Sequence, residues 1–152
     1  MSLCFNRALL VALAALPGCL MAAVRAESAW VGEVPPASPV AAAYLTLVND
    51  GAQPVRVLSL SSPLAASVEW HDMWHADGMM RMQRRRDIVL PPHSRTVLAP
   101  SGSHLMLNAP VRALPPGSQV PLRLALSGGQ VLSLQAVVRA SDAEPAPSAP
   151  VH

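Results

Sequence analysis

The sequence predicts an all-β fold, either a β-sandwich or a Greek-key barrel. Short runs of residues alternate between apolar and polar side chains, which is the period of a half-buried strand. Turn-forming residues separate these runs at intervals of about ten residues, a spacing typical of sandwiches and barrels. Downstream of residue 26, no stretch shows the longer period of a full-length amphipathic helix. Together these observations favour a single β domain.

The alternation predicts nine strands, taken in chain order. They are expected at residues 29–33, 42–49, 56–61, 67–74, 78–83, 96–98, 104–107, 120–127 and 130–139. Asn49-Asp50-Gly51 marks one turn between strands. Ser127-Gly128-Gly129-Gln130 marks a hairpin with a two-residue loop. Proline pairs at 35–36, 91–92 and 115–116 punctuate the remaining loops.

The first 26 residues are expected to be a secretory signal peptide. Arg7 precedes an apolar run, and Val24-Arg25-Ala26 offers small residues to a signal peptidase, so we expect cleavage before Glu27. The run is too short for a membrane-spanning helix. A competing interpretation is a lipoprotein box at Leu16-Pro17-Gly18-Cys19, with a lipid on Cys19, although Pro17 is a poor residue there. We therefore expect a periplasmic protein, with lipid anchoring as the alternative.

Removal of the leader leaves a β domain at 27–140 and a Pro/Ala-rich, disordered tail at 141–152. Both cysteines, Cys4 and Cys19, fall in the leader. The expected mature chain therefore excludes a disulfide framework, a blue-copper or binuclear thiolate centre, and a thiol oxidoreductase. Eleven basic residues minus the two in the leader leave nine, which equals the nine acids. This balance argues against nucleic-acid binding.

Methionine and histidine concentrate in one part of the sequence. After the leader, every methionine lies between residues 73 and 106, and four of the five histidines lie between 71 and 104. Imidazole and thioether are the ligands of a soft ion such as Cu(I). Side chains two apart on a strand share a face, so His104 projects beside Met106. A tight turn at 76–78 would bring the His71 and Met82 ends together as a hairpin, and a third strand carrying His104 would close the site. The alternation of side chains along a strand does not by itself show which further residues bind the metal, the candidates being Met73, His75, Met80 and Met82.

The spacing His71-x10-Met82-x21-His104-x-Met106 resembles the signature of the PCu(A)C family of periplasmic copper chaperones. Segments 41–47 and 102–107 are also similar to that family. The resemblance implies a cupredoxin-like Greek-key β-sandwich in which Cu(I) is bound by His71, Met82, His104 and Met106. It also implies copper delivery to the CuA domain of cytochrome c oxidase subunit II, alone or beside a Sco-type thiol protein. Two departures are Trp70, where the family more often has a smaller residue, and a tail poor in methionine and histidine.

Two other functional classes remain open beside a copper chaperone. One is a copper buffer or resistance protein without a dedicated acceptor, and the other is an adhesion or assembly module that binds no metal. An enzyme is not expected, because the sequence offers no identifiable pair of nucleophile and base. We also expect a monomer.

Several side chains near the expected ligands have alternative roles. Core filling is as good an explanation as metal binding for Met79 and Met80. We expect Met73 and His75 to be non-essential. A carboxylate could balance the charge of the metal or orient an imidazole, the candidates being Glu69, Asp72 and Asp77. A basic cluster could dock an acidic partner or form a solvated edge, and it comprises Arg81, Arg84, Arg85 and Arg86.

Overall fold

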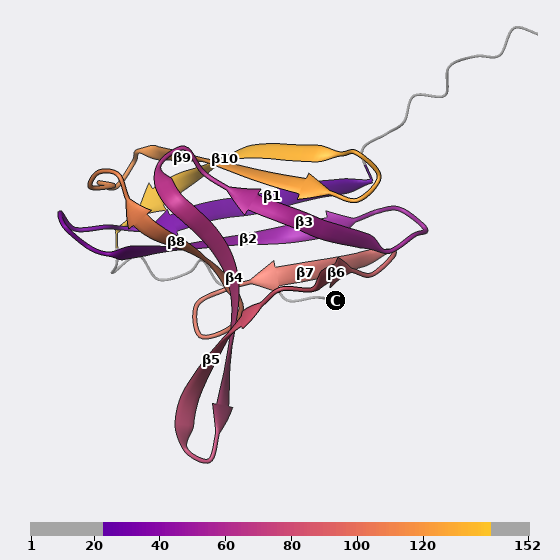
Figure 1. The fold of residues 1–152 in the computed structure, drawn as a ribbon, viewed down its shortest axis with the longest axis horizontal. Coiled ribbons are helices and arrows are strands. Elements are labelled where there is room, and N and C mark those ends of the chain that lie inside the picture. The colour runs from indigo at the N-terminus through magenta and orange to yellow at the C-terminus, as the bar shows by residue number, and fades with distance from the viewer. Residues whose placement is uncertain (1–22, 141–152) are drawn as a thin grey trace, which may run out of the picture.

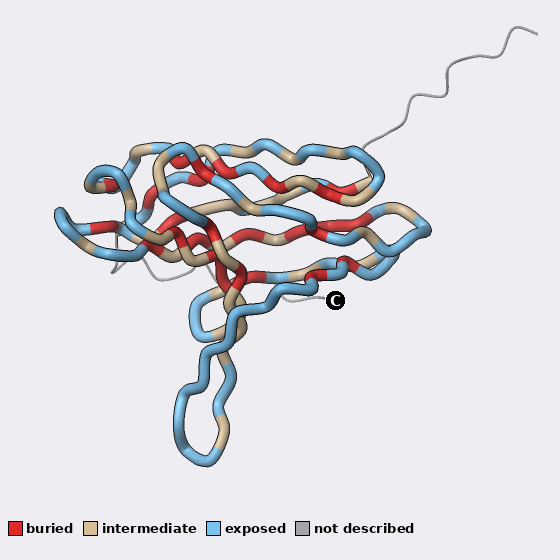
Figure 2. The backbone as a smooth tube through the Cα atoms, viewed as in Figure 1, coloured by how far each residue is buried: buried red, intermediate tan, exposed pale blue. Residues whose placement is uncertain are grey.

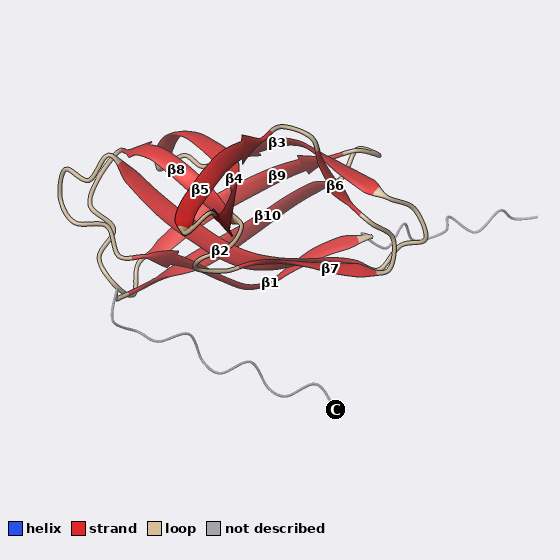
Figure 3. Cartoon of the chain, turned by 90° about the horizontal axis from the view of Figure 1, so that it is seen from below, coloured by secondary structure: helices blue, strands red, loops and turns tan. Residues whose placement is uncertain are grey.

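The computed structural model describes residues 23–140, and all of the regular structure in this part is β (Figures 1 and 3). The all-β prediction is therefore confirmed. Within residues 23–140 there is no helix that could cross a membrane. The ten strands are β1 (Val24–Gly32), β2 (Val40–Asn49), β3 (Val55–Ser61), β4 (Ala65–Ala76), β5 (Met79–Arg85), β6 (Ile88–Leu90), β7 (Ser94–Leu98), β8 (His104–Pro110), β9 (Gln119–Leu126) and β10 (Val131–Arg139).

The strands form one sheet that folds over on itself into two layers (Figure 1). Its order is β5-β4-β8-β2-β1-β10-β9-β3-β6, with β7 paired to β2. Only the β1–β10 pair is parallel among the named strands. Strand β2 is shared, because its first half pairs with β8 and its second half pairs with β7. Since β6 pairs with β3 and β7 follows directly in sequence, this segment joins the two layers.

The core lies between the layers (Figure 2). It is built from the apolar residues that alternate with polar ones along the strands. In β9, for example, every second side chain from Val120 to Leu126 is buried, whereas the intervening residues are not. Burial of each such side chain stabilises the fold by about 1.5–3 kcal/mol. Trp70 is the largest fully buried side chain. The residue that departs from the resembled family is therefore a central core residue on β4.

A buried amide closes the turn after β2. Asn49 is 1% exposed, and its Nδ2 donates to the carbonyl oxygens of Gln53, Leu90 and Pro91 at 2.9, 3.1 and 3.0 Å. Its Oδ1 accepts a hydrogen bond from the Gly51 amide at 3.0 Å. The Asn-Asp-Gly turn that the sequence indicates is therefore stabilised by contacts to a second, distant loop.

Two local details differ from the sequence prediction. Strand β6 was not predicted, because its three apolar residues are fewer than the alternation needs to be recognised. The loop between β9 and β10 is longer than two residues, since the Leu126 amide donates to the Gln130 carbonyl and the first paired residues are Ala125 and Val131. Gly128 and Gly129, both with φ of 85°, supply the left-handed backbone that this loop needs.

Strand β1 begins at Val24, upstream of the cleavage position expected before Glu27. Val24 is 1% exposed and pairs with Asn49, and the Asp50 amide donates to the Ala23 carbonyl. Small apolar residues satisfy both a signal peptidase and a strand, which is why the sequence pattern did not separate the two. The rest of the expected leader, including Cys4 and Cys19, and the expected tail at 141–152 lie outside the described residues.

Strands β4 and β5 form a hairpin whose outer half extends away from the sandwich (Figure 1). The turn residues Asp77 and Gly78 have φ of 53° and 71°, as a two-residue type I′ turn requires. The inner half of β4 is anchored by pairing with β8 and by buried Val68 and Trp70. In contrast, all seven residues of β5 are exposed (Figure 2).

Candidate metal centre

His71 and His104 lie directly opposite each other on neighbouring strands. They are cross-strand partners in the β4–β8 pair, and their ring centroids are 5.8 Å apart in a stacked arrangement. His104 is 5% exposed, and the His71 side chain is 12% exposed. The pairing brings together two imidazoles that are 33 positions apart in the sequence and holds them largely out of water.

The hydrogen bonds of the two rings assign one free nitrogen to each. His104 Nδ1 lies 3.3 Å from the Gly102 carbonyl oxygen, which can only accept, so Nδ1 donates and Nε2 keeps its lone pair. His71 Nε2 lies 3.0 Å from Oε2 of Glu69, so Nε2 donates to the carboxylate and Nδ1 keeps its lone pair. Carboxylates and carbonyls fix metal-binding histidines in this way.

His71 Nδ1 is buried and has no hydrogen-bond partner among the described residues. A buried acceptor left unpaired costs about 1–3 kcal/mol. A metal ion at this nitrogen would use the lone pair and remove that cost. The residues present therefore fit a metal-binding role for His71.

The thioethers lie on the same face of the sheet as the two imidazoles. Met106 is two residues beyond His104 on β8 and is the cross-strand partner of Glu69. Met82 pairs with Met73, which is two residues beyond His71 on β4. Directly paired residues share a face, so all four expected ligands project from one side of the sheet. Met82 is 53% exposed, which places it at the solvent side of the cluster.

Hairpin formation between β4 and β5 and closure by β8 agree with the sequence prediction. The structure places His71, His104 and Met106 on adjacent positions and Met82 one step farther along the hairpin. Met73 occupies the position opposite Met82 and is equally on this face. Met79 and Met80 are 57% and 43% exposed, so the core-filling interpretation is wrong for both.

Glu69 is the carboxylate that orients an imidazole in this structure. The hydrogen bond from His71 lowers the pKa of Glu69 below its usual value, and the nearby Arg84 guanidinium, 3.0 Å from Oε1, lowers it further. Burial opposes this change but does not outweigh it. Glu69 is therefore a carboxylate at neutral pH and supplies one negative charge beside ligands that are all neutral.

Asp72 has a different role, on the opposite face of β4. Its Oδ1 accepts from Trp70 Nε1 at 3.1 Å and from the Ser103 hydroxyl at 2.6 Å, and Arg85 lies 2.6 Å from Oδ2. Burial raises the pKa of Asp72, but these hydrogen bonds and the Arg85 charge together lower it. Asp72 thus ties the core tryptophan to the loop before His104. Asp77 lies in the hairpin turn.

A stack of aromatic side chains, which the sequence did not indicate, borders the histidines. The Tyr44 ring centroid is 6.4 Å from that of His104, and Trp30 lies 4.5 Å beyond Tyr44. Arg139 caps this stack, with its guanidinium carbon 5.1 Å from the Trp30 ring centroid. Burial raises the pKa of the Tyr44 phenol. The sequence does not show that β2 pairs with β8, so alternation along β2 alone could not have identified Tyr44.

Within residues 23–140, no three residues from the set His, Cys, Asp and Glu are grouped so as to hold a metal ion. The two histidines are joined on their face of the sheet by methionine instead. Of the other histidines, His75 lies farther out on the hairpin, and His93 lies in the β6–β7 loop with φ of 49°. His152 lies outside the described residues.

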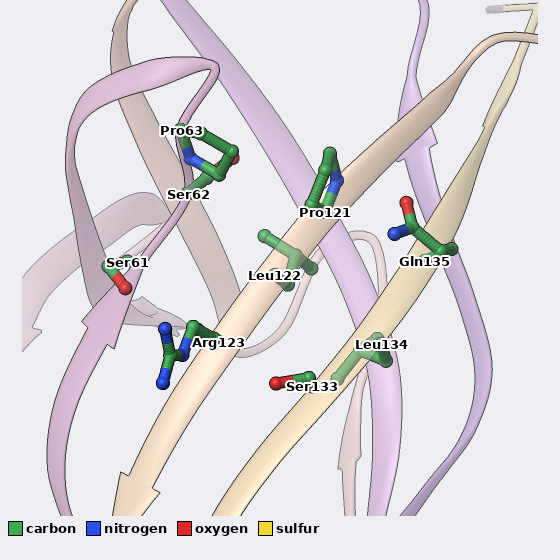
Figure 4. A pocket seen from close by; sticks show the side chains of 9 residues that line it. All are labelled: Ser61, Ser62, Pro63, Pro121, Leu122, Arg123, Ser133, Leu134 and Gln135. Atoms are coloured by element: carbon green, nitrogen blue, oxygen red, sulfur yellow. The ribbon is translucent and has the colours of Figure 1, made fainter.

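A groove of about 560 Å³ lies on another part of the surface, between β3, β9 and β10 (Figure 4). Its lining includes Leu122, Leu134 and Arg123, and it contains no histidine or methionine. The groove is therefore separate from the His/Met cluster and takes no part in the candidate metal centre.

Comparison with known proteins finds a family and a relative that are both described as lipoproteins. Residues 24–138 match the family described as "Putative lipoprotein LpqE-like". A protein of Leifsonia xyli subsp. xyli named "Putative lipoprotein Lxx21020" is 31% identical over 121 residues, which cover 79% of this chain and 72% of that protein.

Two solved copper-bound structures share the fold. The copper-bound PCuAC domain from PmoF2 is 26% identical, with a TM-score of 0.65 over 78% of this chain and 94% of that one. The Cu(I) form of DR1885 from Deinococcus radiodurans is 31% identical, with a TM-score of 0.62 over 77% of this chain and 78% of that one. These likenesses confirm the family resemblance and the cupredoxin-like β-sandwich that the ligand spacing indicated.

Proposed function

The chain belongs to the LpqE-like lipoprotein family, and from this premise we propose that it is an exported metallochaperone for Cu(I). Copper is the metal held by the similar solved domains. The ligands in this proposal are His71, Met82, His104 and Met106. The protein acts as a monomer in this proposal and has no catalytic activity.

The main support for this proposal is Nδ1 of His71, which lacks a hydrogen-bond partner among the described residues. Nδ1 is buried and unpaired among the described residues, while Nε2 is held by Glu69. His104 has the complementary arrangement, in which Gly102 holds Nδ1 and Nε2 remains free. Both rings therefore present one lone pair and have a hydrogen-bond partner at the other nitrogen, as expected of metal ligands.

The donor set suits monovalent copper. Thioethers are soft, neutral ligands that select Cu(I) over hard cations, and they lack the reactivity of a free thiolate in an oxidising compartment. Glu69 supplies a negative charge next to His71 without needing to bind the ion itself. Met82 is much more exposed than either histidine, so we propose that an incoming acceptor ligand displaces Met82 first.

We propose that the acceptor is the CuA domain of cytochrome c oxidase subunit II, a Sco-type thiol protein, or both in turn. An arginine-lined groove of about 500 Å³ lies at the base of the hairpin, and its lining includes Asp72 and Gln83, which project from the face opposite His71. Arg84 and Arg85 are paired with Glu69 and Asp72, whereas Arg86 makes no ion pair within residues 23–140. This basic surface supports docking of an acidic partner.

Metal titration tests the site. The double variant His71→Ala, His104→Ala should bind one equivalent of Cu(I) fewer than the parent protein while keeping its β-sheet circular dichroism. Equal numbers of bound equivalents in the variant and the parent protein would rule out the centre proposed here.

Transfer separates the chaperone from the alternative, a periplasmic copper buffer or resistance protein. The Cu(I)-loaded protein should pass its ion to an apo CuA domain or to a Sco-type protein, measured by separating the two proteins and assaying copper. A folded, loaded protein that transfers no copper to either acceptor would favour the buffer.

We further propose an envelope location in which the mature chain retains all of β1. Cleavage before Glu27 would remove Val24, whose side chain is 1% exposed and whose burial is worth about 1.5–3 kcal/mol. Processing at the lipoprotein box would instead leave β1 whole and place a lipid on Cys19, which agrees with the description of the relatives as lipoproteins.

Mass spectrometry of the protein extracted from cell envelopes tests this location. The expected species begins at Cys19 and carries acyl chains, and a Cys19→Ala variant should lose them. A mature protein that begins at Glu27 and is released in soluble form would show that secretion into the periplasm without an anchor is correct.

A further inference from the structure

We propose that the outer half of the β4–β5 hairpin carries a second soft-metal site, in which Met73, His75 and Met80 bind Cu(I). This inference rests on the proposed function, because the hairpin site would bind Cu(I) on its way into or out of the His71–His104 centre. It concerns side chains that neither the signature spacing nor the primary site requires.

The register of the hairpin brings these side chains together. His75 is the cross-strand partner of Met80, and Met73 is the partner of Met82. The two-residue turn makes Ala76 and Met79 a hydrogen-bonded pair. Hydrogen-bonded and non-hydrogen-bonded pairs alternate along the hairpin, so the His75–Met80 and Met73–Met82 pairs are both non-hydrogen-bonded. In such pairs the Cα atoms are only about 4.5 Å apart and the side chains approach most closely.

All of these pairs project from the face that carries His71. Residues 71, 73 and 75 alternate with residues 72 and 74 along β4, and their partners on β5 follow the same parity. Successive pairs on one face are separated by about 7 Å along the strand. Met82 therefore lies between the histidine centre and the His75–Met80 pair, within reach of both for a long, flexible side chain.

Packing does not explain why methionines occupy this surface. Met80 and Met82 are 43% and 53% exposed, and among the described strands β5 pairs only with β4. A two-stranded ribbon gains little from apolar side chains that contact water, and an exposed strand edge usually carries charged residues instead. Metal binding gives these thioethers a function that core packing does not.

The face of the hairpin that carries His71 presents no unpaired arginine among the described residues that would oppose a bound cation. Arg81 pairs with Trp74, so it projects from the opposite face. Arg84 shares the face of His71 but is bound to Glu69 at 3.0 Å. Between Arg84 and the turn, the face therefore carries only neutral imidazole and thioether groups, which is the donor set of Cu(I).

Anaerobic titration with Cu(I) tests the second site. The wild-type protein should bind two equivalents, and the variant His75→Gln, Met80→Leu should bind one. These substitutions keep side-chain size and strand propensity while removing a nitrogen and a sulfur ligand. The matched control is His93→Gln, Met79→Leu, which changes the same residue types in the β6–β7 loop and on the other hairpin face, and it should still bind two.

The variant of the primary centre, His71→Ala, His104→Ala, distinguishes this inference from the proposed function. If the outer site exists, that variant should keep one equivalent, and the equivalent should disappear when His75→Gln, Met80→Leu is added. If the wild-type protein binds a single equivalent, or if His75→Gln, Met80→Leu still binds two, the inference is wrong whether or not the primary centre binds copper.

Discussion

Removal of the Glu69 carboxylate should weaken Cu(I) binding without unfolding the protein. Glu69 holds His71 Nε2 at 3.0 Å and thereby leaves Nδ1 free to bind the ion. Loss of such a partner typically reduces metal affinity 10–100-fold, which corresponds to about 1.4–2.8 kcal/mol. We expect Glu69→Ala to show this full loss. Glu69→Gln should lose less, because its amide oxygen still accepts the hydrogen bond from His71 while the charge is gone.

Competition with a chromophoric Cu(I) chelator under anaerobic conditions measures these affinities. The matched control is Glu27→Ala, because Glu27 is likewise a carboxylate held by two basic side chains, Arg25 and Arg95, but lies on β1 away from the histidines. This control should retain wild-type affinity. A Glu69→Ala protein that binds Cu(I) within about twofold of the wild type would refute the role assigned to the carboxylate and, with it, the assignment of Nδ1 as the metal-binding nitrogen.

Three further predictions concern the scaffold. Asn49→Ala should lower the free energy of unfolding by about 3 kcal/mol in urea denaturation, because it leaves buried carbonyls unpaired, whereas a loss below about 1 kcal/mol would contradict the network. Trp70→Ala should cost about 3–5 kcal/mol in the same assay, and a smaller loss than that of Val57→Ala would show that the tryptophan is not central to the core. Tyr44 is the single tyrosine, so absorbance near 295 nm reports its ionisation, which should have a midpoint above the ordinary value of 10.0. Because the folded-state pKa of Tyr44 is raised, its contribution to stability is present below pH 10 and is lost as pH rises through the raised pKa; a midpoint at or below 10 would contradict its burial.

The alternation of side chains along the strands and the spacing of the turns were enough to predict most of the fold and the outline of the site. The alternation in β9 and the turn signals at Asn49 and Gly78 depend on local chemistry, so they are legible in one sequence. The hairpin of β4 and β5 follows from the same information, because its two-residue turn fixes the register. For this reason the placement of Met82 near the His71 strand was predictable.

The electronic details of the site were not predictable in this way. Whether His71 binds through Nδ1 or Nε2 depends on the side-chain rotamers that bring Nε2 to Glu69, two residues away on the same strand, and alternation along a strand does not give rotamers. The partner of His104 is the Gly102 carbonyl, and no side chain in the sequence records the direction of a carbonyl. Likewise, Tyr44 reaches His104 across a strand pair that joins distant segments. Such contacts are set by tertiary structure, which periodicity does not describe.

X-ray absorption on protein loaded with one equivalent of Cu(I) tests the His/Met centre. We expect two nitrogen neighbours, from His71 and His104, and two sulfur neighbours, from Met82 and Met106. A copper ion with no imidazole neighbour, or one surrounded only by nitrogen and oxygen, would contradict the His/Met centre.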